Sequence, residues 1–153
     1  GQRVRGDHRA LSKGGKDGNM FWFTEGIATY FESFKRNDKL EFVLGAVASG
    51  SWLPAIKAAV RKKDTYVPLE PFVSMVYGQA MSFPPQMIGL LYAQAWSFVH
   101  FLYNADNGKY RSKFEDYFLK EINGQGGKET FQAIFGDISA VEQEWVTYVT
   151  NLK

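Results

Sequence analysis

The sequence contains no cysteine, only two histidines, and no long uninterrupted apolar run. The absence of cysteine excludes disulfide bonds and thiolate metal sites, and it leaves the compartment open. A membrane-spanning helix needs roughly 18 or more apolar residues in a row, so we expect no membrane partner. The formal net charge of +2 is close to neutral and gives no general reason to expect a nucleic-acid partner.

What the sequence does contain favours one folded domain with a real core. Apolar residues make up 45% of the 153 residues and aromatic residues make up 16%. A chain of this size can bury roughly two-thirds of its unfolded surface. Residues 1–19 are basic and glycine-rich with little apolar periodicity, so we expect a mobile loop or arm there. We predict that residues 20–153 form a single all-α domain, a helical bundle.

The most strongly periodic segment runs from Met87 to Tyr103, where two adjacent stripes of apolar side chains repeat at helical spacing. A helix that is apolar on most of its circumference is buried, so this helix should be the centre of the bundle. We expect His100, which lies on it, to be a core histidine bonded to backbone. Trp22, Trp96 and Trp145 should be largely buried.

The other helices are predicted from apolar spacing and from their start and stop residues. An apolar segment at 40–46 is too short to assign, and 77–85 is predicted to be a loop. The expected helices are 24 to about 35 capped by Thr24, 51–63 capped by Ser51, 68–73, 110–122, 129–135, and a last helix opened by a Ser139–Glu142 capping box.

The stretch Trp22–Ser33 organises the rest of the chain. Read as a helix, it places Glu25, Ala28, Thr29 and Glu32 on one face and a broad set of apolar side chains on the other: Phe23, Ile27, Tyr30, Phe31 and Phe34. Gly26 lies inside this helix, where glycine costs roughly 1 kcal/mol relative to alanine. We therefore expect another element to come close to the backbone at Gly26.

The residues of the pattern W-x-x-E-G-x-A, Trp22 to Ala28, resemble the second metal-site helix of gluzincin-type zinc metallopeptidases. The order continues through Tyr92–Trp96, Phe135-Gly136 and Trp145, and it resembles a bacterial family of unknown function with a peptidase-MA-like fold. The resemblance implies a fold like the C-terminal helical part of a gluzincin domain. It also implies a zinc cofactor in the full-length parent and a peptide or protein substrate.

The resemblance assigns roles to three residues. Glu25 takes the position of the third zinc ligand; the alternative is an ordinary glutamate in a first helical turn, which the helix dipole favours. Glu32 would be an acceptor that orients a ligand histidine, although a solvated glutamate is the more common situation. Tyr92 would donate a hydrogen bond to the oxyanion of the tetrahedral intermediate, and its alternative is a tyrosine at the edge of the core.

The sequence also departs from the family pattern, because it contains no H-E-x-x-H. Its histidines are His8 and His100, and neither has a partner four residues on. We expect either a fragment that begins after the missing motif or a protein that has lost its zinc site. On either account, this chain alone should bind no zinc tightly and should be inactive.

Two other functions stay open. The fold can serve as a non-catalytic helical module that binds peptides or proteins. Less strongly, the basic arm at 1–19 together with Arg61–Lys63 can bind nucleic acid, although solvated charges at a helix end explain this pattern better.

Overall fold

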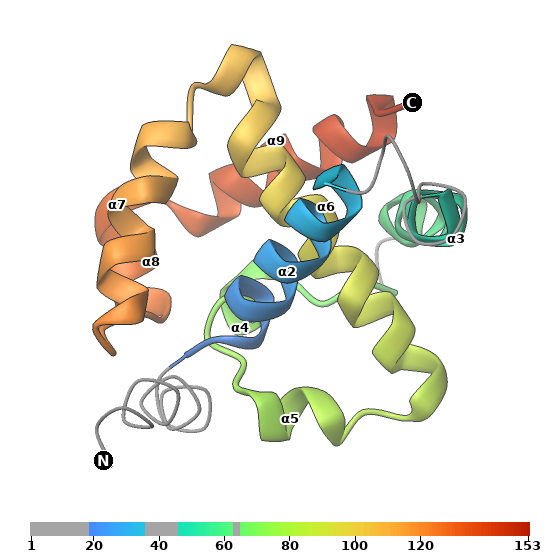
Figure 1. The fold of residues 1–153 in the computed structure, drawn as a ribbon, viewed down its shortest axis with the longest axis horizontal. Coiled ribbons are helices and arrows are strands. Elements are labelled where there is room, and N and C mark those ends of the chain that lie inside the picture. Colours follow the sequence, from blue (N-terminus) through green and yellow to red (C-terminus); the bar gives the residue numbers. More distant parts are fainter. Residues whose placement is uncertain (1–18, 36–45, 63–64) are drawn as a thin grey trace.

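The structure is a computed structural model that describes residues 19–35, 46–62 and 65–153, and all its described elements are helices (Figure 1). Residues 1–18 of the predicted arm and most of the apolar segment at 40–46 fall outside these residues; Asn19, the last residue of that arm, is described and is buried. The all-α prediction is confirmed. The helices are α2 Phe21–Lys35, α3 Ala46–Arg61, α4 Leu69–Phe72, α5 Tyr77–Met81, α6 Pro85–Gly108, α7 Arg111–Ile122, α8 Lys128–Phe135 and α9 Ile138–Asn151.

Helix α6 is the centre of the bundle, as its two apolar stripes predict. α2 and α3 pack against it, and α9 crosses it (Figure 1). Phe98 on α6 lies at the heart of the core, with its ring 5.1 Å from that of Trp22 and 6.3 Å from that of Trp145. The residues of α6 that are buried include Leu91, Ala93, Ala95, Trp96, Phe98, Val99, Phe101 and Leu102.

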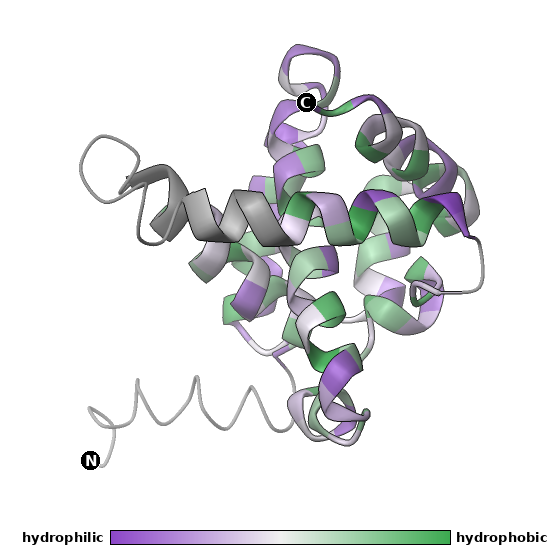
Figure 2. Cartoon of the chain, turned by 90° about the vertical axis from the view of Figure 1, so that its right-hand side faces the viewer, coloured by the Kyte–Doolittle hydropathy of each residue, from purple (hydrophilic) through white to green (hydrophobic). Residues whose placement is uncertain are grey.

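The three predicted core tryptophans are buried: the exposed fraction is 0% for Trp22, 6% for Trp96 and 0% for Trp145. Trp145 also makes a polar contact, because its indole N–H donates to the Ser97 hydroxyl at 3.0 Å. In Figure 2 the hydrophobic residues lie mainly on helix faces turned toward other helices. None of the helices within the described ranges is both long and apolar enough to span a bilayer.

Helices α2 and α6 touch at Gly26, as the glycine inside α2 predicts. A β-carbon placed on Gly26 would lie 2.5 Å from Val99 Cγ2 and 2.7 Å from the carbonyl oxygen of Ala95. Both distances are far inside van der Waals contact. No residue with a side chain fits here without moving one helix, so Gly26 sets how closely the two helices pack.

The predicted start of α2 is wrong. The helix begins at Phe21, so Thr24 lies inside it rather than at its N-cap. The N–H groups at this start are satisfied by distant groups: Met20 N donates to the Glu121 carboxylate at 2.7 Å, and Phe21 N donates to the Met75 carbonyl at 2.9 Å. A tertiary cap therefore replaces the local one that the sequence pattern favours.

The caps predicted for α3 and α9 are also wrong. α3 begins at Ala46, so Ser51 lies within it, and α9 begins at Ile138, one residue before Ser139. The predicted capping box does not form, because the Glu142 carboxylate binds groups outside α9. Glu142 accepts hydrogen bonds from the Tyr66 hydroxyl and the Leu69 N–H, both at 2.9 Å.

Two segments around α6 differ in detail from expectation. Part of the predicted loop at 77–85 is the short helix α5, which begins where Gln79 Oε1 accepts the Val76 N–H at 2.9 Å. At the other end of α6, the regular helix stops before Ala105, whose ψ is 135°. Asp106, Asn107 and Gly108 follow with φ of 48°, 60° and 86°.

Two glycine-to-alanine substitutions separate packing from helix propensity. Gly26→Ala should destabilise the fold by about 1–3 kcal/mol, because the new methyl group overlaps α6. Gly89→Ala is the matched control: Gly89 also lies in a helix, but a β-carbon there meets nothing within 4 Å. It should stabilise the fold by up to about 1 kcal/mol, since alanine favours the helix.

Denaturant unfolding of both variants measures these changes directly. A Gly26→Ala protein as stable as the wild type would show that α2 and α6 do not make the close contact described here.

Candidate functional site

Glu25 lies one turn into α2 and is half-buried. Within the part of the chain that the structure describes, its carboxylate has no hydrogen-bond or ion-pair partner. Burial raises the pKa of the Glu25 carboxyl above its usual value of 4.5. A half-buried carboxylate without a partner is costly, and such groups gather at functional sites.

Tyr92 lies on α6, close enough to this carboxylate for the Glu25 charge to act on its hydroxyl. Its ring meets the ring of Phe21 edge-on, with 5.3 Å between the ring centres. The pKa of the Tyr92 hydroxyl is raised first by burial and then by the negative charge of Glu25. The structure therefore brings the two predicted site residues into one electrostatic environment, although no direct hydrogen bond joins them.

The close contact at Gly26 places these two residues together. Along the interface Phe21 meets Tyr92, Gly26 meets Ala95 and Val99, and Tyr30 meets His100 with 5.5 Å between their rings. α2 and α6 thus run in the same direction. Glu25 precedes Gly26 by one residue, so the contact that brings the backbones together also brings Glu25 toward Tyr92.

The remaining predicted residues do not join this site in the described structure. His8 and the side chain of Glu32 lie outside the described residues. His100 is half-buried and has a backbone hydrogen bond, as expected; its Nδ1 also lies 2.6 Å from the Tyr148 hydroxyl, a contact that was not predicted. Burial lowers the pKa of His100. His100 is eight residues beyond Tyr92, or about 12 Å along α6.

No three histidine, aspartate or glutamate side chains among the described residues come close enough to hold a metal ion. The described inventory near the candidate site is Glu25 with Tyr92 beside it. Glu25 alone is too little for a zinc centre, which takes about three protein ligands.

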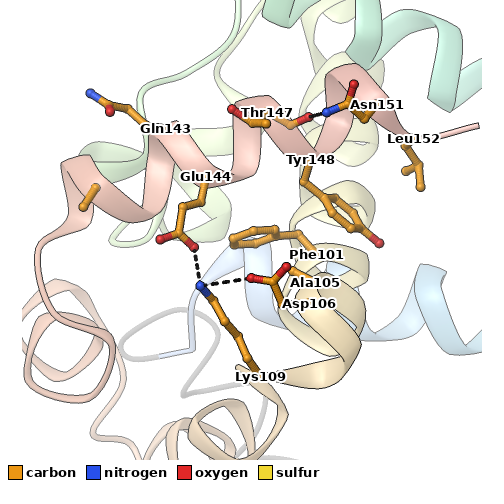
Figure 3. A pocket seen from close by; sticks show the side chains of 11 residues that line it. Phe101, Ala105, Asp106, Lys109, Gln143, Glu144, Thr147, Tyr148, Asn151 and Leu152 are labelled. Carbon is orange, nitrogen blue, oxygen red and sulfur yellow. Dashed lines mark hydrogen bonds and ion pairs between the residues drawn. The ribbon is translucent and has the colours of Figure 1, made fainter.

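A groove of about 690 Å³ lies elsewhere, between the end of α6 and the outer side of α9 (Figure 3). Phe101 and Ala105 line it together with Lys109, whose ammonium group pairs with Asp106 at 3.3 Å and Glu144 at 3.2 Å. The charged groups of this groove thus pair with one another. Its lining on α6 begins at Phe101, about 14 Å along the helix from Tyr92, so it is separate from the Glu25 site.

A buried acidic network on α7 was not predicted as a site. Glu121 is fully buried and accepts hydrogen bonds from the Asn19 side chain at 3.0 Å, from Met20 N at 2.7 Å and from the Tyr117 hydroxyl at 2.6 Å. Burial raises the pKa of Glu121, and these three donors act in the opposite direction. The sequence feature that could have indicated this network is Glu121 itself, which lies on the same stripe of the predicted helix as Phe114 and Tyr117.

Comparison of the chain with protein families, with curated proteins and with solved structures gave no match. The likeness to gluzincin peptidases therefore rests on the residues of W-x-x-E-G-x-A. We infer the function from the geometry of Glu25 and its neighbours.

The raised pKa of Glu25 predicts how stability depends on pH. Because the folded-state pKa lies above the unfolded-state value, the native state binds this proton more tightly. The resulting stabilisation is complete below the unfolded-state pKa and is lost as pH rises through the folded-state pKa. Glu25→Gln should therefore stabilise the fold at pH 7, and the gain should vanish below about pH 4.

Thermal unfolding across this pH range is the measurement, with Glu129→Gln as the control because Glu129 is exposed in the first turn of α8. That variant should gain no stability. Glu25→Gln should also lower the pKa of Tyr92, since it removes a nearby negative charge. A loss of stability in Glu25→Gln at pH 7 would mean that the carboxylate has a stabilising partner.

Proposed function

We propose that this chain supplies the carboxylate side of a zinc metallopeptidase-like centre, in which Glu25 is a zinc ligand and Tyr92 lines the same cleft. The observation that carries this proposal is the half-buried Glu25 carboxylate. It has no partner among the described side chains, and it is held beside Tyr92 by the glycine contact. The alternative of a first-turn glutamate does not apply, because α2 begins at Phe21 and has no acidic residue in its first turn, and it would not account for Gly26, which lets α6 approach.

The chemistry of Glu25 fits one ligand of such a centre. A carboxylate oxygen is an accepted zinc ligand, and a bound cation would offset the desolvation that raises its pKa. The described residues do not supply the other ligands. On this proposal, polypeptide other than residues 1–153 supplies the two imidazoles.

Each residue has a defined task in the proposed centre. When bound, zinc would polarise the scissile carbonyl and activate water for attack. Glu25 would hold one coordination position. Tyr92 would donate a hydrogen bond to the developing oxyanion, since a tyrosine hydroxyl is protonated at neutral pH. The substrate would be a peptide or protein.

A non-catalytic binding module is the alternative, and exposed apolar side chains on α7 favour it. The exposed fraction is 38% for Phe118, 59% for Leu119 and 47% for Ile122, all within one turn. An exposed apolar cluster of this kind often contacts another protein. This function needs no metal, so metal binding separates the two proposals.

Zinc titration by calorimetry tests the metallopeptidase proposal. The present chain should show no tight stoichiometric binding, since Glu25 is one ligand where about three are needed. A longer chain from the same reading frame should bind zinc tightly if it encodes H-E-x-x-H. Glu25→Gln should then weaken binding sharply, and the control Glu129→Gln should leave it unchanged.

Two results would contradict this reading. Submicromolar stoichiometric binding to the present chain that survives loss of both His8 and His100 would place the site elsewhere. Tight binding by the longer chain that is unaffected by Glu25→Gln would remove Glu25 from the ligand set.

A further inference from the structure

A glutamate on α7 caps the N-terminal end of helix α2. Glu121 Oε2 accepts the Met20 N–H at 2.7 Å and the Asn19 side-chain N–H at 3.0 Å, and the Glu121 carbonyl accepts the same Asn19 amide at 3.1 Å. The first N–H groups of a helix have no partner within the helix and need an acceptor. Here a carboxylate about 100 residues away in the sequence caps α2.

The position of Glu121 is costly for α7 itself. It lies in the last turn of that helix, where the helix dipole disfavours a negative charge, and it is fully buried. The backbone of Gly126 leaves room for it, because a β-carbon there would overlap the carboxylate. For α2 the same charge lies at the N-terminus, where the dipole favours it. The Glu121 carboxylate therefore stabilises the start of α2, although its charge is unfavourable at the end of α7.

The capped end of α2 is also the end that carries Glu25. One helical turn separates Phe21 from Glu25, and each residue of a helix rotates the side-chain direction by about 100°. A rotation of α2 about its axis by one residue position, about 100°, would therefore turn Glu25 to a different side of the helix. Trp22, between the two, packs its ring 5.3 Å from that of Tyr117, the residue that donates to Glu121 Oε1.

We propose that Glu121 is a positioning residue for Glu25: by capping α2 from α7, it fixes the first turns of α2 and so holds Glu25 beside Tyr92. This inference rests on the proposed function only in giving Glu25 the role of a zinc ligand. The effect of Glu121 on the position of Glu25 does not depend on that role.

The fold contains a matched control for this role. Glu142 also accepts a tyrosine hydroxyl, that of Tyr66, and a backbone N–H at a helix start, that of Leu69. The helix that it caps is α4, which carries neither Glu25 nor Tyr92. A purely structural cap and a positioning cap can therefore be compared within one protein.

Chemical cross-linking measures the position of Glu25 without a metal. The chain has no cysteine, so Glu25→Cys with Tyr92→Cys introduces the only two thiols. A short bifunctional thiol reagent should join them rapidly in the otherwise wild-type chain. Adding Glu121→Gln should slow this step by about threefold or more, because intramolecular rates depend on how the groups are held. Adding Glu142→Gln should leave the rate nearly unchanged.

Dichroism and unfolding curves show whether each variant is folded under the cross-linking conditions. An unchanged rate in a folded Glu121→Gln protein overturns the proposal, as does an equal loss of rate in Glu142→Gln. If Glu121→Gln does not fold, Asn19→Ala takes its place, since it removes one donor of the network and leaves the buried carboxylate. An unchanged rate in that variant would overturn the proposal equally, whatever the zinc titrations show.

Discussion

The contact between the backbones of α2 and α6 at Gly26 is the constraint on which the candidate site depends. The absence of a side chain at one position lets two helices pack more closely than their other residues allow. Aromatic rings flank the contact: Phe21 meets Tyr92 on one side, and Tyr30 meets His100 on the other. The glycine lowers the helix propensity of α2. In exchange, it fixes the spacing between the helix that carries Glu25 and the helix that carries Tyr92.

Long-range hydrogen bonds then set where the helices begin. Glu121 caps α2 and Glu142 caps α4, each from a distant helix. Gln94 acts similarly on the segment before α4, where its side chain exchanges two hydrogen bonds with the backbone of Val67. Buried polar groups of this kind cost free energy unless they are satisfied, and when satisfied they specify one arrangement. Apolar packing in the bundle thus centres on α6, and a few polar side chains fix where the surrounding helices begin.

This division explains what could be predicted from the sequence. Apolar periodicity is a local property, so the central helix and the burial of Trp22, Trp96 and Trp145 could be predicted. The caps predicted at Thr24 and Ser139 are wrong, because the acceptor at the start of α2 lies about 100 residues away and Glu142 binds Tyr66 and Leu69. The same limit applies to the site. Gly26 indicated a close neighbour, but its identity depended on how α2 pairs with α6.

The contrast among three glutamates bears on the candidate site. Glu121 is buried deeper than Glu25, yet it has three donors; Glu142 is half-buried and has two. Glu25 is half-buried and has none among the described residues. The same fold that satisfies the first two carboxylates gives the third no donor among the described residues, and its charge raises the pKa of Tyr92. A glutamine at position 25 would avoid the desolvation of a charge, so packing alone does not favour a glutamate there. On the proposed function, a cation bound to this carboxylate would offset that desolvation.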